Sequence, residues 1–252
     1  MHDNIKKTAV VTGGNKGIGL AITEKFLKEN FIVYVGARSK IIYTGPNKKN
    51  LKFIRMNAEN YNSHFKLAKI AKKNTGRLDV YINNVGYSEW KPINLIDNTF
   101  LNKMISTNLK SVFWGSKAAL KIGKKNFSII NISSIAGKRG SKNNSAYCST
   151  KFGVNGLTQS LAKELGEKNI TVNAICPVLI KTSGLIKALK SKHSPSEKNV
   201  KKFFLDFTKN NSALNKLPSA QDVANLCFYL SMEKSKAITG QCINLDCGVF
   251  PQ

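Results

Sequence analysis

The stretch of sequence that decides the fold is Thr12-Gly13-Gly14-Asn15-Lys16-Gly17-Ile18-Gly19, near the start of a chain of 252 residues. A short β-branched segment, Lys7–Thr12, leads into it, and a segment with helical spacing, Ile18–Glu29, follows. Glycines let a backbone turn sharply and approach a phosphate closely, and a helix N-terminus offers free N–H groups and a positive dipole end. The stretch therefore predicts a strand–loop–helix unit that binds a pyrophosphate, with a plain tight turn as the alternative.

Outside this stretch, short apolar segments alternate with longer amphipathic ones. This alternation is typical of βαβ units around a parallel sheet whose strands are buried on both faces. The candidate strands are Lys7–Thr12, Phe31–Gly36, Leu51–Met56, Leu78–Asn83, Phe127–Ser133, Thr171–Cys176 and Gln241–Asp246. The candidate helices are Ile18–Glu29, Ser63–Lys73, Asn98–Ile122 (one helix, or two broken near Asn108), Ala146–Glu167 and Ala220–Met232. We predict an α/β protein with a single-domain Rossmann fold over residues 1–252, in which helices cover both faces of a doubly wound, seven-stranded parallel sheet.

The segment at about 183–217 departs from this alternation, because its apolar residues keep helical spacing and no strand pattern interrupts them. A long excursion beside a compact sheet is more often a functional lid than an idle loop. We therefore predict a lid over the site, with an additional pair of surface helices as the alternative.

The composition is strongly basic, with 40 Lys and Arg residues against 14 Asp and Glu and a net charge of +26. Such a charge can indicate an acidic partner such as nucleic acid or a membrane surface. However, only four of the basic residues are Arg, the preferred residue for bidentate phosphate recognition, and the lysines are dispersed along the chain. We therefore predict a solvated, Lys-rich surface and expect no nucleic-acid or membrane partner, with polyanion binding as the alternative.

Other features concern the location of the protein and its metal content. No segment approaches the roughly 20 apolar residues needed to span a bilayer, and the first residues run directly into a strand-like segment. The five cysteines include no CxxC pair, and the three histidines are scattered. We therefore expect a cytoplasmic protein without a signal peptide, a structural disulfide or a metal site.

A second group of polar residues follows the fifth candidate strand. Tyr147 and Lys151 have i, i+4 spacing, so they lie on one face of a helix. A nearby ammonium lowers the pKa of a tyrosine from about 10, so that the side chain can exchange a proton near neutral pH. Ser134 lies 13 residues before Tyr147 and ends an apolar strand, at the sheet edge where doubly wound folds place their ligands. These three residues predict proton exchange beside the pyrophosphate loop.

The Thr-Gly-x-x-x-Gly-x-Gly spacing, the Tyr-x-x-x-Lys pair and the serine before it together resemble the short-chain dehydrogenase/reductase family over nearly the whole chain. The resemblance implies that Ser134 polarises a substrate carbonyl and that Tyr147 exchanges the proton. It also implies that Lys151 holds the nicotinamide ribose and lowers the tyrosine pKa. Asn108 matches the family's fourth catalytic position, which anchors a water that relays protons.

Two further segments match motifs of that family. Asn83-Asn84-Val85-Gly86 resembles its Asn-Asn-Ala-Gly turn, and Pro177 and Thr182 match a Pro-Gly…Thr motif in which Val178 replaces the glycine. By resemblance, the residues expected to bind the cofactor are Gly13, Asn15, Lys16, Gly17, Ile18, Gly19, Arg38, Asn57, Ala58, Asn84, Gly86, Tyr147, Lys151, Pro177 and Thr182. The family is usually tetrameric through its long helices and its C-terminal strand region, so a homo-oligomer is expected.

The choice of cofactor depends on the end of the second strand. A carboxylate there would bind the adenosine ribose and repel a 2′-phosphate, but the position holds Ala37, followed by Arg38. Lys16 adds a second cation, and both cations match positions that favour NADP in the family. We therefore expect NADP(H) over NAD(H), with Asn57 in the usual aspartate position beside the adenine.

The resemblance implies hydride transfer between a small-molecule carbonyl and a secondary alcohol. The substrate pocket is expected between Tyr87-Ser88-Glu89-Trp90, Gly137-Lys138-Arg139-Gly140-Ser141 and the segment after Val178. Its candidate apolar walls are Trp90, Phe203, Phe204 and Phe207, with packing in the core or at an interface as the alternative for each. Its candidate cations are Lys138, Arg139 and Lys181. A 3-oxoacyl-thioester reductase is the first expectation, and a sugar or polyol dehydrogenase is the alternative. A non-catalytic dinucleotide-binding regulatory protein is the second alternative.

Overall fold

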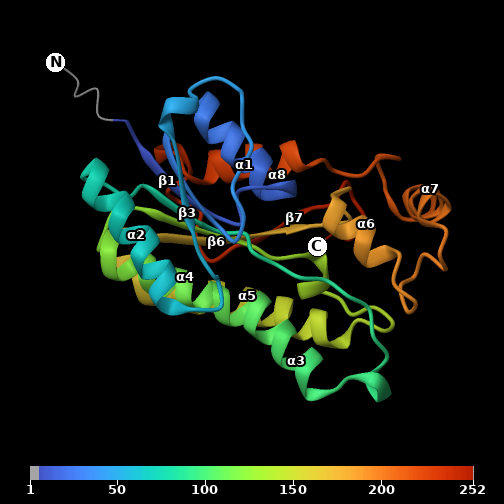
Figure 1. The fold of residues 1–252 in the computed structure, drawn as a ribbon. Coiled ribbons are helices and arrows are strands. Elements are labelled where there is room, and N and C mark those ends of the chain that lie inside the picture. Colours follow the sequence, from blue (N-terminus) through green and yellow to red (C-terminus); the bar gives the residue numbers. More distant parts are fainter. Residues whose placement is uncertain (1–5, 252) are drawn as a thin grey trace.

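The computed structural model describes residues 6–251, which form one sheet of seven parallel strands. The strand order is β3-β2-β1-β4-β5-β6-β7, with helices on both faces (Figure 1). The strands are β1 Thr8–Thr12, β2 Ile32–Ala37, β3 Leu51–Arg55, β4 Val80–Asn83, β5 Ser128–Ile132, β6 Thr171–Pro177 and β7 Cys242–Leu245. The helices are α1 Gly17–Lys28, α2 Tyr61–Thr75, α3 Asn98–Ile105, α4 Ser111–Gly123, α5 Ser145–Leu165, α6 Ser183–Leu189, α7 Val200–Asn211 and α8 Ala220–Leu230. The predicted α/β fold is confirmed.

Helices cover each face of the sheet (Figure 1), and a separate buried apolar cluster lies under each layer of helices. On one face, Ile22 and Phe26 of α1 share a buried cluster with Val223 of α8. On the other face, Leu67 of α2 and Leu165 of α5 belong to a second buried cluster, to which α4 also contributes. Because both faces are covered, the strands are nearly continuous apolar runs, the pattern from which the sequence predicts a parallel sheet.

The order in which strands are added to the sheet reverses at β1, which lies between β2 and β4. The loops on either side diverge at the carboxyl ends of these strands, and open α/β sheets bind their ligands in the crevice that forms there. The loop after β1 is tied to its neighbour by the Gly13 N–H, which donates to the Gly36 carbonyl at 2.7 Å. The glycine-rich stretch is therefore held at this crevice.

The predicted helix Asn98–Ile122 is observed as α3 and α4, joined by a π-helical turn at Ser106–Lys110. The turn lies at the predicted break and carries Asn108, whose side chain is fully buried. Short π-helical turns inside longer helices often occur at functional sites. The chain therefore stays helical from α3 through the π-helical turn into α4.

The segment at about 183–217 contains α6 and α7, which lie beyond the carboxyl ends of the strands (Figure 1). Leu189 of α6 and Phe204 of α7 share an apolar cluster with Trp90, which follows β4. Both helices are thus packed against the loop after β4, and closure of this segment as a lid stays a prediction.

No helix in the part of the chain that the structure describes is long and apolar enough to cross a membrane. Residues 6–251 also contain no group of three or more His, Cys, Asp or Glu side chains that could hold a metal ion. The thiols of all five cysteines are free.

Candidate active site

The glycine-rich loop joins β1 to α1 and needs its glycines for two reasons. Gly13 and Gly17 have φ angles of 65° and 54°, in the left-handed region that other residues disfavour. Gly19 has no room for a side chain, because a Cβ there would overlap the Gly13 carbonyl oxygen. Lys16 at the N-cap of α1 has an ammonium, which accepts no hydrogen bond and so leaves the first N–H groups of the helix uncapped. The loop can therefore receive a phosphate against bare backbone.

Asn84, directly after β4, braces this loop. Its Nδ2 donates to the carbonyl oxygens of Thr12 and Gly13 at 3.0 and 3.2 Å. Its backbone N–H donates to the Thr12 hydroxyl at 3.0 Å. The Asn-Asn-Val-Gly turn thus fixes the conformation of the phosphate loop from the neighbouring strand.

A cavity of about 1200 Å³ opens at the carboxyl edge of the sheet, and we call it the main cavity. Its wall includes Ser134 and every residue expected to bind the cofactor, namely Gly13, Asn15, Lys16, Gly17, Ile18, Gly19, Arg38, Asn57, Ala58, Asn84, Gly86, Tyr147, Lys151, Pro177 and Thr182. The fold therefore brings together residues that are far apart in the sequence, and their binding roles stay predictions.

One end of the main cavity lies beyond β2, and we call it the β2 end. Ala37 is buried there, whereas the Arg38 side chain is exposed at the cavity wall together with Lys16. Asn15 ties this corner together, because its Nδ2 donates to the Ser39 carbonyl and hydroxyl oxygens at 3.1 and 2.9 Å. The corner presents two cations and a hydroxyl, a setting that suits a phosphate group.

Ser134 and Tyr147 line the main cavity further along. Ser134 follows β5, and its Oγ accepts a hydrogen bond from the Ala136 N–H at 3.1 Å. Burial raises the pKa of Tyr147 to about 12, and a hydrogen bond with the Ser134 hydroxyl offsets this rise only in part. The sequence predicted a lowered pKa for this tyrosine, so the direction is corrected here: the loss of water around the phenol outweighs its favourable neighbours. The phenol is protonated at neutral pH.

Lys151 lies one turn further along α5 and is only 3% exposed. Its Nζ donates to the Ile132 carbonyl at 2.9 Å and lies 5.7 Å from the centre of the Tyr147 ring. Burial lowers the pKa of the ammonium to about 8. Lys151 is therefore beside the phenol ring, and it loses its charge just above neutral pH.

Asn108 uses both ends of its amide to hold neighbouring segments. Its Oδ1 accepts from the Tyr87 N–H at 2.7 Å, and its Nδ2 donates to the Tyr87 carbonyl at 2.8 Å and to the Thr150 hydroxyl at 3.3 Å. The Thr150 hydroxyl in turn donates to the Tyr147 carbonyl at 2.7 Å. The side chain thus links the loop after β4 to the start of α5, and its predicted role in a water relay stays a prediction.

Beyond Tyr147 the main cavity continues into the region expected to bind substrate, and we call this the substrate end. The predicted residues that line it are Tyr87, Ser88, Glu89, Trp90, Arg139, Gly140, Ser141, Phe203 and Phe207. Phe204 and Lys181 are not among the lining residues, because Phe204 packs in the cluster of Trp90 and the Lys181 Nζ lies 4.9 Å from the Phe204 ring centre. Three cations that were not predicted from the sequence line the cavity instead: Lys103, Lys142 and Lys187.

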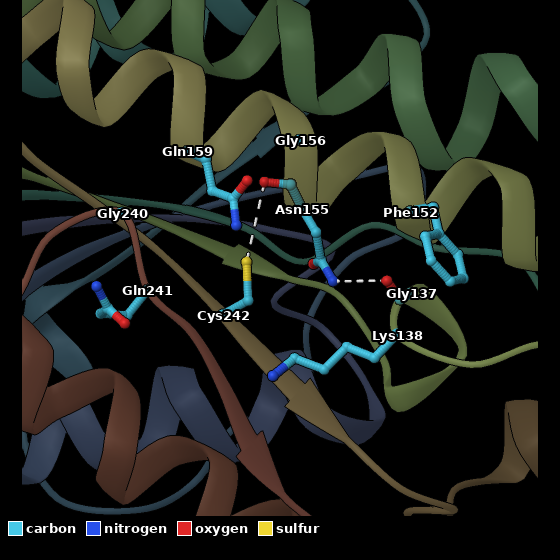
Figure 2. Close-up of a pocket in the computed structure, with 9 residues that line it drawn as sticks. All are labelled: Gly137, Lys138, Phe152, Asn155, Gly156, Gln159, Gly240, Gln241 and Cys242. Carbon is cyan, nitrogen blue, oxygen red and sulfur yellow. Dashed lines mark hydrogen bonds between the residues drawn. The ribbon is translucent and has the colours of Figure 1, made fainter. Parts of the chain in front are cut away.

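Lys138 lines a second pocket, of about 500 Å³, between α5 and the start of β7 (Figure 2). Asn155 stands at the wall of this pocket, and its Nδ2 donates to the Gly137 carbonyl at 2.9 Å. The Cys242 thiol donates to the Asn155 carbonyl at 3.9 Å. The expectation that Lys138 faces the substrate is therefore wrong, because Gly137 and Lys138 line this second pocket and not the main cavity.

Val178 stands where the family motif has glycine, and the structure shows which residues its larger side chain contacts. Its side chain is 2% exposed and packs with Ile135 and Val249 in a small apolar cluster. Ile135 directly follows Ser134, and Val249 belongs to the C-terminal segment. The larger side chain therefore joins the C-terminal segment to the loop that carries Ser134.

Three residues near the main cavity whose polar side-chain atoms are buried were not predicted from the sequence: His64, Asn144 and Ser191. His64 contacts the loop after β3, as described below. Asn144 is 5% exposed, and while its Nδ2 donates to the Ser141 hydroxyl at 3.0 Å, its Oδ1 has no partner among residues 6–251. The Ser191 hydroxyl is likewise unpaired within the described range, and both Asn144 and Ser191 line the cavity. Asn144 could have been identified from its position in the sequence, because it lies about one helical turn before Tyr147.

A parallel sheet with a glycine-rich loop at its switch point defines a dinucleotide-binding α/β protein. The family model described as short chain dehydrogenase matches residues 7–193. The chain is 32% identical over 252 residues to a 3-oxoacyl-[acyl-carrier-protein] reductase of Buchnera aphidicola subsp. Baizongia pistaciae, with 97% of this chain and 98% of that protein covered. It is 32% identical over 259 residues to an L-2,3-butanediol dehydrogenase of Corynebacterium glutamicum, with 98% and 99% covered.

Among solved structures, a variant of the actinorhodin polyketide ketoreductase with NADPH matches with a TM-score of 0.87 and 26% identity, over 99% of each chain. The chain belongs to the short-chain dehydrogenase family. It is therefore an oxidoreductase on a fold that binds a nicotinamide dinucleotide, and the predicted family is confirmed.

Proposed function

We propose that this protein is an NADP(H)-dependent enzyme that reduces the carbonyl of a small molecule to a secondary alcohol. The observation that carries the proposal is that Ser134, Tyr147 and Lys151 line the same cavity as the glycine-rich loop. A dinucleotide fits this cavity, because the loop offers bare backbone where a Cβ at Gly19 would overlap its neighbour, and cations occupy the β2 end. When bound, the nicotinamide ring supplies the hydride.

The side chains of this protein handle the proton and the charge. Ser134 hydrogen-bonds the substrate carbonyl oxygen and orients it towards Tyr147. Because the pKa of Tyr147 is raised to about 12, the phenol carries its proton at neutral pH and donates it to that oxygen. Lys151 places an ammonium beside the phenol and holds the ribose next to the nicotinamide. A protonated tyrosine suits reduction, which consumes a proton, better than oxidation.

The preference for NADP(H) over NAD(H) is part of the proposal. Support comes from Arg38 and Lys16, which are both exposed at the β2 end, and from the absence of an acidic residue at the end of β2. A 2′-phosphate there would find two cationic partners. The structure of the ketoreductase named above contains NADPH.

A 3-oxoacyl thioester is the first candidate substrate. Phe203 and Phe207 supply an apolar wall, and Lys142 and Lys187 offer positive charge to an anionic carrier or phosphate. A relative with 32% identity is named as a 3-oxoacyl-[acyl-carrier-protein] reductase.

A sugar, polyol or hydroxyketone is the second candidate, favoured by a different observation. Asn144 and Ser191 each have a polar atom without a partner in the described residues, and both residues line the cavity. Buried polar atoms without partners cost about 1–3 kcal/mol, so a hydroxyl-bearing substrate that reached them would recover this energy. A relative with 32% identity is named as a butanediol dehydrogenase.

We also propose one catalytic domain over residues 1–252, a homotetramer and a cytoplasmic location. The assembly is supported by Phe113 on α4 and Phe152 on α5, whose side chains are 49% and 48% exposed. Exposed large apolar residues on adjoining helices often mark an interface. Light scattering after size-exclusion chromatography tests this, and a mass near the 27.8 kDa of one chain would contradict a tetramer.

The test of function is NADPH oxidation with a panel of short 3-oxoacyl thioesters, keto sugars, hydroxyketones and simple ketones, with Tyr147→Phe in parallel. We expect turnover by the wild type with at least one class. Loss of the proton donor should lower kcat by about 10²- to 10⁴-fold.

Binding measurements complete this test, and Tyr147→Phe should bind NADPH with an affinity within about twofold of the wild type. A wild-type protein that binds NADPH but turns over no carbonyl faster than Tyr147→Phe would favour the regulatory, non-catalytic alternative. Equal affinity for NADPH and NADH would contradict the cofactor preference.

A further inference from the structure

A buried chain of hydrogen bonds connects β4 and α2 to the β2 end of the main cavity. Tyr81 lies on β4 and His64 on α2, and both side chains are completely inaccessible to solvent. The His64 Nδ1 is 2.8 Å from the Tyr81 hydroxyl, and the His64 Nε2 is 2.7 Å from the Ala58 carbonyl oxygen. Ala58 belongs to the loop after β3, and it lines the cavity.

The direction of both hydrogen bonds follows from the chemistry of the groups. A carbonyl oxygen only accepts, so the His64 Nε2 must carry the hydrogen and donate it to Ala58. The Nδ1 of the neutral ring then has no hydrogen, and it accepts from the Tyr81 hydroxyl. Burial lowers the pKa of His64 to about 4 and raises that of Tyr81, so both groups are neutral at physiological pH. The imidazole therefore has one tautomer and one orientation.

The loop that His64 holds has few other ties to the sheet. Met56 N–H donates to the Ala37 carbonyl at 3.0 Å, which joins the start of the loop to β2 beside Arg38. Further along, the Asn57 side chain turns back on its own loop, where its Oδ1 accepts from the Glu59 N–H at 3.1 Å. Two side chains from other elements hold the loop: His64 of α2 donates to the Ala58 carbonyl, and the Thr107 hydroxyl donates to the Glu59 carboxylate at 2.8 Å. The contact at Ala58 is the one adjacent to Asn57, so it bears most directly on the position of Asn57 at the cavity.

We propose that Tyr81 and His64 are positioning residues for the adenosine half of the dinucleotide, acting through the Ala58 carbonyl and the adjacent Asn57. This inference rests on the proposed function, which places the adenosine at the end of the cavity near Arg38. Packing alone does not require this pair, because two apolar side chains would fill the same interior space without burying the Tyr81 hydroxyl and the two ring nitrogens of His64. Hydrogen bonds restrict direction as well as distance, and they set the loop in one place before the ligand arrives.

Three variants separate positioning from packing. His64→Leu fills most of the volume but cannot donate to Ala58, whereas His64→Gln keeps an amide N–H that can reach the same carbonyl. Tyr81→Phe removes only the hydroxyl that fixes the imidazole. The probes are adenosine 2′,5′-bisphosphate and 5′-AMP, titrated calorimetrically, because they test the adenosine half without turnover.

We expect His64→Leu to weaken binding of the tighter of the two probes about tenfold and Tyr81→Phe to weaken it about threefold, the range for loss of one hydrogen bond. His64→Gln should bind within about threefold of the wild type. At saturating NADPH, kcat should stay within about twofold in all three, while KM for NADPH rises in proportion to the weakened probe binding.

Wild-type probe affinity in a folded His64→Leu would overturn the inference, and so would a fall in kcat at saturating NADPH that matches the fall in affinity. If His64→Leu does not fold, Tyr81→Phe decides, and unchanged affinity in that variant would overturn the inference. A wild-type protein that binds neither probe would contradict the proposed cofactor site itself. A protein that binds them but reduces no carbonyl would contradict only the proposed reaction.

Discussion

The β2 end and the substrate end of the main cavity are built in different ways. The β2 end consists of short loops that directly follow β1, β2 and β3, and its shape is set by backbone contacts such as the one between Gly13 and Gly36. The substrate end is formed by α6, α7 and the loops after β4 and β5, and its shape is set by packed side chains such as Trp90 and Phe203. One end is therefore specified by positions where side chains are excluded, and the other by the side chains themselves.

This difference has a functional consequence. A ligand portion shared by a whole family can be bound by backbone N–H groups and a few fixed polar residues. A variable ligand portion needs walls that can change without disturbing the sheet, and residues on loops and added helices meet that need. Substitutions at the β2 end should therefore affect the dinucleotide, and substitutions at the substrate end should affect the substrate.

The largest expected effect of a substitution at the backbone-built end is that of Gly19→Ala. A Cβ at Gly19 would overlap the Gly13 carbonyl oxygen and crowd the Asn84 amide, so the loop must move. We expect NADPH affinity to fall about 100-fold, since several backbone hydrogen bonds to the phosphates would be displaced together. Isothermal titration calorimetry measures this.

Gly156→Ala is the matched control, because a Cβ at that helical position meets no atom within 4 Å. It should leave NADPH affinity unchanged and leave stability the same or slightly higher, since alanine is the better helix former. Equal losses in both variants would show that the effect of Gly19→Ala is not local to the phosphate loop.

The next prediction concerns the pH dependence of kcat, which Lys151 and Tyr147 control between the two ends of the main cavity. Because burial lowers the pKa of Lys151 to about 8, the ammonium is present below that pH and is lost above it. Tyr147, with a pKa raised to about 12, keeps its proton through the same range. The kcat for reduction should therefore be flat below about pH 7 and fall about tenfold per pH unit well above pH 8.

The profile is measured between pH 6.5 and 9.5 with both substrates saturating. Cys176 is the other titratable group whose charge acts on Lys151, and burial raises the pKa of its thiol. Lys151→Arg should remove the decline near pH 8, since a guanidinium keeps its charge. A wild-type profile that rises through pH 8 would assign the titration to a group that acts as a base.

The sequence signals for the glycine-rich loop and for the Tyr147–Lys151 pair are local. The spacing of Gly13, Gly17 and Gly19 and the i, i+4 spacing of Tyr147 and Lys151 each depend on a few nearby residues, and these five residues line one cavity. The alternation of strands and helices predicted the sheet, because strands buried on both faces are short apolar runs and the helices between them are amphipathic. Strand and helix ends were displaced by one or two residues, as at α2, where Asn60 caps the helix through the Ser63 N–H.

What the sequence did not predict depends on contacts between distant segments. The pKa of Tyr147 rises because of burial, which only the folded chain defines. Lys138 lines the second pocket and Phe204 packs in the cluster of Trp90, although the neighbouring Arg139 and Phe203 line the main cavity. His64 was missed because a histidine on an amphipathic helix gives no sign of the Tyr81 and Ala58 groups that it contacts.

A smaller effect is expected from Arg38→Ala, which sharpens the comparison within the β2 end. Loss of one exposed cation should weaken NADPH binding about fivefold and leave NADH binding unchanged, since only the 2′-phosphate distinguishes them. Lys40→Ala, two residues further on and outside the cavity wall, is the control for general charge. Fluorescence titration with both cofactors at two salt concentrations measures the difference, and an equal loss in the two variants would indicate non-specific attraction.

The smallest functional effect is expected from Val178→Gly at the substrate end, which restores the family's glycine. The change leaves a void between Ile135 and Val249, so we expect a loss of stability of about 2–3 kcal/mol. Because Ile135 adjoins Ser134, the KM for substrate should rise about threefold, whereas NADPH affinity should not change. Val249→Ala tests whether the cluster acts as one unit: if it does, the double variant loses less stability than the two single losses added together. Additive losses together with an unchanged substrate KM would show that Val178 only fills space, and the C-terminal segment would then have no part in shaping the substrate end.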